Sequence, residues 1–145
     1  MNRLTKKLNE LKKQNKKALV AYLVAGDPDL DSTLDIMHML VKSGVDVIEV
    51  GVPFTDPIAE GPIIQRAHDR AITKKTSLID IFDLITKFRV KDNETPIVLM
   101  GYLNSFIFFK DLIIENKNNS VDSILVVDIP GELNIEDYGI KNKNI

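Results

Sequence analysis

The sequence contains no cysteine and few histidines. A chain without cysteine has no disulfide bonds and no thiolate metal ligands, which is consistent with a reducing compartment. Its two histidines, His38 and His68, are both predicted to lie on helices. We therefore expect neither a disulfide-bonded fold nor a metal site.

Long hydrophobic runs are absent as well, and neither sign of charge dominates. No apolar stretch approaches the ~20 residues of a membrane-spanning helix. The lysine-rich N-terminus lacks the apolar centre of an export signal. The formal net charge of −2 provides no general attraction to nucleic acid. We expect a cytoplasmic protein that binds neither nucleic acid nor a membrane.

The overall composition is typical of a globular protein. The 145 residues are 44% hydrophobic and 28% charged, which suffices for one hydrophobic core. We therefore expect a single domain over residues 1–145.

The N-terminal segment, residues 1–16, is predicted to carry an amphipathic helix from residue 2 to residue 16. Leu4, Leu8 and Leu11 recur at helical spacing, and lysines surround them. The basic face allows binding to nucleic acid or to a membrane. The favoured interpretation is a solvated lysine face, with the leucine stripe packed on the body of the protein.

Four apolar runs predict β-strands, at residues 18–25, 45–50, 96–100 and 121–129. Segments with helical periodicity separate the strands. The alternation of strand and helix predicts a parallel α/β sheet. The second and fourth strands also resemble each other in sequence.

The helix boundaries carry local signals. Asp31 or Ser32 is predicted to cap the first helix after strand 18–25, and Gly44 to end it. Pro62 is predicted to begin the next helix, and Ser77 to cap the third. A further helix is predicted over residues 105–116.

The spacing of apolar residues predicts which side of each helix is buried. His38 is predicted to lie on the surface, and His68 at the edge of a buried stripe. The residues predicted to face the core are Leu34, Met37, Leu40, Val41, Ile63, Ala67, Ala71, Leu78, Phe82 and Ile85.

Glu49 lies inside the apolar strand 45–50, where a carboxylate conflicts with burial. Burial would raise its pKa, which suits a group that transfers a proton near neutral pH. The alternative is an edge strand with Glu49 directed to water. A second acid, Glu60, follows in the loop that leaves the same strand end, and two converging carboxylates favour acid–base chemistry.

In parallel α/β folds, functional residues gather at the carboxyl ends of the strands. Tyr22, Glu49, Glu60, Tyr102 and Asp128 all fall at or just beyond that end. For Asp128 a hydrogen bond to a neighbouring loop is favoured over a catalytic role. The agreement of several positions indicates an active site at this edge.

Five segments together resemble one enzyme family. They are the leading amphipathic helix and residues 25–29 (AGDPD), 48–67, 100–104 (MGYLN) and 121–130. They resemble the tryptophan synthase alpha subunit family over about 130 residues, and the resemblance fades in the tail, 131–145. It implies a (β/α)8 TIM barrel, of which this chain would supply about the first four β/α units.

The resemblance implies retro-aldol cleavage of indole-3-glycerol phosphate to indole and glyceraldehyde 3-phosphate, without a cofactor. Glu49 would be the general acid and base. Glu60 would replace the family's second acid, usually Asp, which holds the indole N–H. The indole pocket would be lined by Tyr22, Met100, Tyr102 and Val127. The tryptophan synthase β subunit, in an α2β2 tetramer, would contact Pro53, Thr55, Asp56 and Pro57.

The length of the chain departs from this family. A barrel of this type has about 250 residues, and its phosphate site is typically built by loops after strands 7–8. The sequence therefore resembles a truncated copy or an incomplete record of a barrel. Besides the lyase, the alternatives are a non-catalytic module that docks on the β subunit and a remnant that self-associates through open strand edges. A different phosphosugar aldolase or isomerase is disfavoured, because no lysine suited to a Schiff base lies at a strand end.

Overall fold

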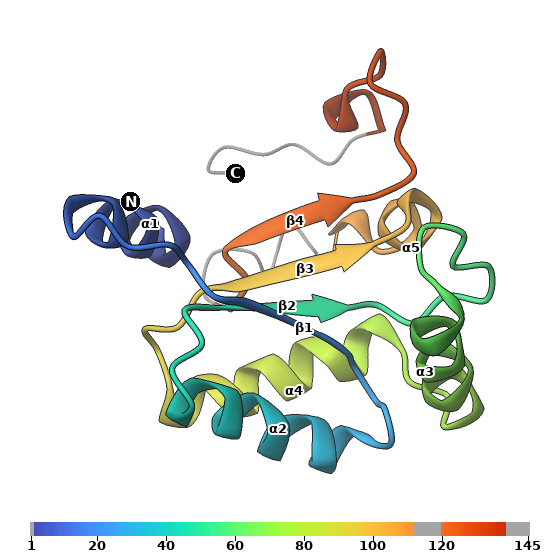
Figure 1. The fold of residues 1–145 in the computed structure, drawn as a ribbon. Helices are drawn as coiled ribbons and strands as arrows, with labels where there is room; N and C mark the ends of the chain where they lie inside the picture. Colours follow the sequence, from blue (N-terminus) through green and yellow to red (C-terminus); the bar gives the residue numbers. More distant parts are fainter. Residues whose placement is uncertain (1, 112–119, 139–145) are drawn as a thin grey trace.

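The computed structural model describes residues 2–111 and 120–138, which contain one sheet and its flanking helices (Figure 1). In chain order the elements are α1 (Arg3–Lys13), β1 (Val20–Val24), α2 (Leu30–Lys42), β2 (Val47–Gly51), α3 (Pro62–Thr73), α4 (Leu78–Lys91), β3 (Ile97–Gly101), α5 (Leu103–Phe108), β4 (Ser123–Val126) and a 3-10 helix (Ile135–Tyr138). The four predicted strands are confirmed. β1 and β4 are shorter than their apolar runs, whereas β2 and β3 each end one residue later than predicted.

The strands are all parallel and lie in the order β1-β2-β3-β4. Tyr22 pairs with Glu49, and Glu49 pairs with Val98. Paired residues of parallel strands project from the same face of a sheet. Tyr22 and Glu49 therefore share one face, and Met100, two residues after Val98, lies on it as well.

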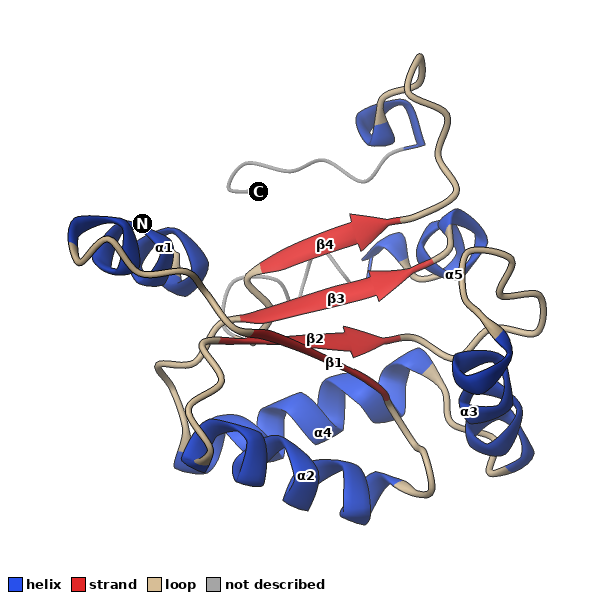
Figure 2. Ribbon diagram, viewed as in Figure 1, coloured by secondary structure: helices blue, strands red, loops and turns tan. Residues whose placement is uncertain are grey.

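The opposite face of the sheet is covered by α2 and α4 (Figure 2). Its strand residues, such as Ile48 and Leu99, pack with Met37 of α2 and with Ile85 and Phe88 of α4 in one buried cluster. The face that carries Tyr22 and Glu49 is more open, since Val20 at its edge is 49% exposed. The prediction that strand 18–25 is buried is therefore wrong at its start, because β1 is an edge strand.

The helix starts agree with the sequence only in part. Ser77 caps α4 in a capping box with Asp80, as predicted. The N-cap of α2 is Asp29, whose side chain accepts a hydrogen bond from the Ser32 amide at 2.8 Å, and not Asp31 or Ser32. A residue two or three positions earlier supplies the same oxygen chemistry, so composition alone did not separate them.

The buried side of α3 differs from the prediction. Ala67 and Ala71 are buried as expected, but Ile63 is 71% exposed. The residue that completes the buried stripe is His68, which has no exposed surface. The predicted surface position of His38 is also wrong in part, because its ring is half-buried and stacks on Phe88 at 4.8 Å.

Helix α1 lies at the N-terminal ends of the strands (Figure 1) and is held there by polar contacts. Arg3 forms an ion pair with Asp122 at 3.1 Å, and Lys6 pairs with Glu94 at 3.1 Å. None of its residues is fully buried, and Leu8 is 45% exposed. Leu4 and Leu11 are half-buried, so the predicted packing of the leucine stripe is confirmed only in part.

The C-terminal part of the chain is described only in sections. Helix α5 covers the start of the helix predicted over residues 105–116, and positions 112–119 lie outside the described residues. The tail predicted from residue 131 contains the short 3-10 helix, and residues 139–145 again lie outside. Among the described helices, none has the length and apolar character needed to cross a membrane.

Candidate functional site

The candidate site lies at the carboxyl ends of β1, β2 and β3, where α3 and the loop after β2 meet the sheet (Figure 1). Glu49 projects from β2, beside Tyr22 of β1. Glu60 ends the loop that leaves β2, and Tyr102 directly follows β3. The predicted gathering of these residues at one edge of the sheet is therefore reproduced by the fold.

Glu49 is half-buried on the open face of the sheet. Among the described residues, none forms a hydrogen bond or an ion pair with its carboxylate. Burial raises its pKa above the ordinary 4.5. A carboxyl group of this kind retains its proton to a higher pH than an exposed glutamate and remains available for exchange with a ligand.

Glu60 is held more tightly, with its side chain only 7% exposed. The Tyr102 hydroxyl donates a hydrogen bond to Glu60 Oε2 and accepts one from the Ala59 amide at 2.9 Å. The Gln65 side-chain amide donates to the Glu60 backbone carbonyl at 2.9 Å. The ring of Phe54 stacks on Tyr102 at 4.8 Å, so the loop is fixed at both ends.

The second carboxylate oxygen of Glu60, Oε1, has a different environment. Within the described part of the chain it is the only buried side-chain oxygen or nitrogen without a hydrogen bond. His68 Nε2 lies 3.4 Å away, close enough for an electrostatic contact but not aligned for a good hydrogen bond. A buried acceptor without a donor costs about 1–3 kcal/mol, so Oε1 is suited to an incoming N–H or O–H.

His68 is the residue that sequence reasoning missed. Its Nδ1 accepts a hydrogen bond from the Phe54 amide at 3.1 Å, and its Nε2 lies 3.4 Å from the Tyr22 hydroxyl. Burial lowers its pKa below 6.5, although the nearby Glu60 carboxylate acts in the opposite direction. The available signal was its spacing from Ala67 and Ala71, which places it on the buried side of α3.

The pKa values of Tyr22 and Tyr102 are both raised by burial and by the nearby carboxylates. Burial raises the pKa of Tyr22, and the negative charges of Glu60 and Glu49 raise it further. Burial and the hydrogen bond to Glu60 raise the pKa of Tyr102 to about 12. Both hydroxyl groups therefore stay protonated at physiological pH and act as hydrogen-bond donors.

A family model described as tryptophan synthase alpha chain matches residues 8–143. The chain belongs to the tryptophan synthase alpha chain family. The tryptophan synthase alpha chain of Alkalilimnicola ehrlichii is 47% identical over 134 residues, which are 91% of this chain and 49% of that protein. The chain thus spans about half the length of the curated relatives it matches.

Solved structures of the same family are similar to the fold of this chain. The crystal structure of tryptophan synthase subunit alpha from Legionella pneumophila matches with a TM-score of 0.85 and 43% identity, over 97% of this chain and 53% of that one. A structure of the tryptophan synthase α2β2 complex from Pyrococcus furiosus matches with a TM-score of 0.72 and 43% identity, over 78% and 46%. The four parallel strands therefore correspond to about half of a TIM barrel.

The remaining predicted site residues lie at or just beyond the carboxyl ends of β3 and β4. Met100 is buried and Val127 half-buried, and both belong to the sheet edge that carries Tyr102. Asp128 accepts a hydrogen bond from the Leu103 amide at 2.7 Å, at the start of α5. The predicted hydrogen-bonding role of Asp128 is therefore confirmed.

The loop over residues 53–60 is exposed at its tip. Thr55 and Asp56 are exposed, and Ile58 is 73% exposed. Pro57 is buried and Pro53 half-buried, so these two prolines shape the loop while its tip faces outward. The assignment of the loop to a partner stays a prediction.

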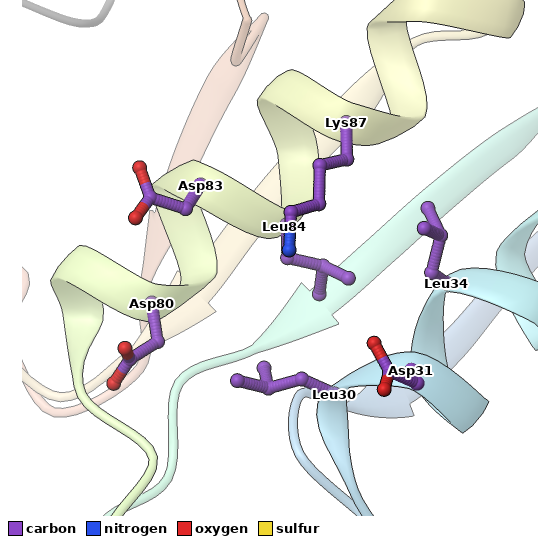
Figure 3. Close-up of a pocket in the computed structure, with 7 residues that line it drawn as sticks. All are labelled: Leu30, Asp31, Leu34, Asp80, Asp83, Leu84 and Lys87. Atoms are coloured by element: carbon purple, nitrogen blue, oxygen red, sulfur yellow. The ribbon is translucent and has the colours of Figure 1, made fainter.

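A pocket of about 100 Å³ lies on the opposite side of the sheet, between α2 and α4 (Figure 3). It is lined by Leu30, Asp31, Leu34, Asp80, Asp83, Leu84 and Lys87. These helices cover the face of the sheet opposite Glu49, so none of the predicted site residues reaches the pocket. No group of three potential metal ligands occurs among residues 2–111 and 120–138.

Gly51 allows Tyr22 to lie against β2. A Cβ atom at position 51 would lie 2.3 Å from the Tyr22 hydroxyl oxygen and 2.8 Å from Cζ. We expect Gly51→Ala to displace the Tyr22 ring and to lower the free energy of unfolding by about 1–3 kcal/mol. In urea unfolding, adding Tyr22→Ala should recover part of that loss, whereas Gly131→Ala, with open space around its Cβ, serves as the control. Strict additivity of the two changes would contradict the contact.

The lowered pKa of His68 predicts a pH-dependent stability. The folded chain takes up the His68 proton at a lower pH than the unfolded chain, whose value is near 6.5. The contribution is therefore complete above pH 6.5 and is lost as the pH falls through the folded-state pKa. Below pH 6.5, the free energy of unfolding should fall more steeply than in His68→Gln, by up to ~1.4 kcal/mol per pH unit. The measurement is urea unfolding of both proteins from pH 8 to 5. If the free energy of unfolding changed with pH by the same amount in both proteins, the prediction would be contradicted.

Proposed function

We propose that this chain carries the acid–base residues for retro-aldol cleavage of indole-3-glycerol phosphate to indole and glyceraldehyde 3-phosphate. The proposal rests on membership of the tryptophan synthase alpha chain family. It also rests on the pair of carboxylates at one edge of the sheet. Glu49 transfers the proton, and Glu60 accepts the indole N–H.

The reaction requires two proton movements and one bond cleavage. A proton adds to indole C3, and the bond from C3 to the hydroxyl-bearing side-chain carbon breaks. Its electron pair returns to the indole ring, and the hydroxyl loses its proton as it becomes the aldehyde. The ring is the electron sink, so the balance requires no oxidant, reductant or cofactor.

Glu49 suits the proton transfer because burial raises its pKa. Its carboxyl group donates to C3 and, once ionised, accepts the hydroxyl proton. The rings and side chains of Tyr22, Met100, Tyr102 and Val127 surround the same edge and provide the indole pocket. The phosphate loops of such barrels follow strands 7–8, so we assign no phosphate ligand among the four described strands.

The observation that carries the proposal is the open acceptor on Glu60. Oε2 is engaged by Tyr102, and Oε1 is buried without a hydrogen bond among the described residues. As charge develops in the transition state, the indole N–H becomes a stronger donor. A fixed carboxylate oxygen at that point stabilises the transition state more than the ground state.

The test is an indole-release assay with the purified 145-residue chain and indole-3-glycerol phosphate. It is run with and without the tryptophan synthase β subunit, because the family forms such complexes, as in the Pyrococcus furiosus structure. Release in proportion to the chain concentration supports the proposal. Absence of release under both conditions overturns catalysis by this chain.

A second function, docking on the β subunit without turnover, is favoured by the exposed tip of the loop that follows β2. Asp56 presents a solvent-exposed carboxylate there, and the neighbouring Ile58 presents an exposed apolar side chain. An apolar centre beside a charge is typical of protein interfaces. The fixed ends of the loop preorganise this surface for a partner.

We expect Asp56→Ala to weaken binding to the β subunit by about 5–30-fold in Kd, or roughly 1–2 kcal/mol. Glu49→Gln should leave this affinity unchanged, because Glu49 lies within β2 and not in the loop. Isothermal titration calorimetry with the isolated β subunit measures both. Equal losses in the two variants, or no loss in either, would contradict docking through the loop.

A further inference from the structure

His68 connects three segments that are distant in the sequence. It lies on α3, it has no exposed surface, and its two nitrogens contact different elements. Nδ1 accepts a hydrogen bond from the Phe54 amide of the loop at 3.1 Å. Nε2 lies 3.4 Å from the Tyr22 hydroxyl on β1 and 3.4 Å from Glu60 Oε1.

These contacts determine which nitrogen carries the proton. A backbone amide only donates a hydrogen bond, so Nδ1 opposite Phe54 must be the unprotonated nitrogen. The proton of the neutral ring is therefore on Nε2, which faces Glu60 and Tyr22. A doubly protonated ring would set an Nδ1–H against the Phe54 N–H, so the loop favours the neutral ring.

We propose that His68 is a positioning residue for Glu60: its neutral ring, protonated on Nε2, orients the carboxylate so that Oε1 remains an open acceptor for a substrate N–H. The inference rests on the function proposed above, in which Glu60 accepts that N–H. Tyr102 holds Oε2 from one side, and His68 faces Oε1 from another. The hydrogen bond on Oε2 and the electrostatic contact of Nε2–H with Oε1 together restrict rotation of the carboxylate more than the hydrogen bond alone does.

The opposite tautomer would reverse this effect. It would place the lone pair of Nε2 against the buried carboxylate, which is repulsive, and would remove the acceptor for the Phe54 amide. The loop and the carboxylate thus depend on the same protonation state. Because carboxylate oxygens carry two lone pairs each, Oε1 can face His68 and still accept a hydrogen bond from a substrate.

The charged and titratable groups around the ring act in both directions. Glu60 from the loop and Asp69 from α3 itself favour a protonated, cationic ring. Burial and the Phe54 amide oppose it, and Tyr22 from β1 offers a hydroxyl that pairs with Nε2–H. Burial is the larger influence, and the pKa of His68 is lowered.

The first test is the tautomer of His68 in the folded chain. The sequence contains two histidines, so ring ¹⁵N signals are assigned by comparison with His38→Gln. We expect a protonated Nε2 and an unprotonated Nδ1 for His68, with signals that do not change between pH 8 and pH 6.5. A protonated Nδ1, or a ring that titrates as a free imidazole does, would overturn the proposal.

The second test uses a matched pair of variants. His68→Gln keeps an N–H donor at about the place of Nε2, whereas His68→Leu keeps the bulk and removes the donor. We expect His68→Leu to lower kcat/KM for indole release by ~100-fold, the cost of ~1 Å misplacement, and to lose the protected Tyr102 hydroxyl proton in the NMR spectrum. His68→Gln should retain most of the parent chain's kcat/KM and the protected Tyr102 hydroxyl proton. Equal losses in the two folded variants would overturn a role for the donor.

The NMR measurements do not require turnover, so they separate this inference from the proposed function. The expected tautomer without indole release would support His68 as the positioning residue and overturn catalysis by this chain. Indole release together with the opposite tautomer would support catalysis by this chain and overturn His68 as the positioning residue. If His68→Leu does not fold, the tautomer in the parent chain and the activity of His68→Gln decide the matter.

Discussion

Glu49→Gln is expected to lower indole release by about 10²–10⁴-fold while leaving the fold intact. Glutamine has the same shape as the protonated acid but holds no exchangeable acidic proton, so it neither donates to C3 nor accepts the hydroxyl proton. Proton transfer by a positioned side chain typically contributes a factor of this size. Because Glu49 is half-buried and its pKa is raised, a neutral amide should also relieve the burial of charge and leave stability equal or higher.

The measurement is steady-state indole release together with the urea-unfolding midpoint. Glu94→Gln is the matched control, because Glu94 is exposed and pairs with Lys6 of α1, which lies at the other end of the sheet. Indole release by Glu49→Gln at the rate of the parent chain would remove Glu49 from the mechanism. A loss confined to KM would assign it to binding and not to chemistry.

Asp122→Ala is expected to lower the free energy of unfolding by about 3–5 kcal/mol, the usual effect of removing one partner of a buried ion pair. The Asp122 side chain is 1% exposed and forms ion pairs with Arg3 and Arg89, both at 3.1 Å. It also accepts a hydrogen bond from the Ile97 amide at the start of β3, at 2.9 Å. Its loss leaves the enclosed guanidinium of Arg89 without this carboxylate and removes the ion pair with Arg3 at the N-terminal end of α1.

Burial already lowers the pKa of Arg89 to about 10, so its charge is poorly solvated. Asp122 is therefore needed to balance it, although Arg89 also donates to backbone carbonyls such as that of Thr95 at 2.6 Å. Urea unfolding gives the loss, and Glu94→Ala is the control, since an exposed pair contributes little. A change in Asp122→Ala as small as in Glu94→Ala would show that the buried network does not stabilise the fold.

The sequence by itself determined the elements and the identity of the two acids. Continuous apolar runs, interrupted by Pro62 and Ser77 as helix starts, were sufficient for the parallel sheet because these signals are local. Glu49 was recognisable because a carboxylate within such a run conflicts with burial. Together with the segment through Glu60, it also identified the family.

Only the tertiary structure decided which other polar side chains are buried, at the candidate site and elsewhere in the fold. The apolar pattern favoured Ile63 over His68 for the core, but His68 is buried because Phe54, Tyr22 and Glu60, from other segments, supply its polar partners. Asp122 has no local signal in the sequence, and its partners lie 33 and 119 positions away in the chain. Burial of a polar group depends on such distant partners, and periodicity in one segment contains no information about them.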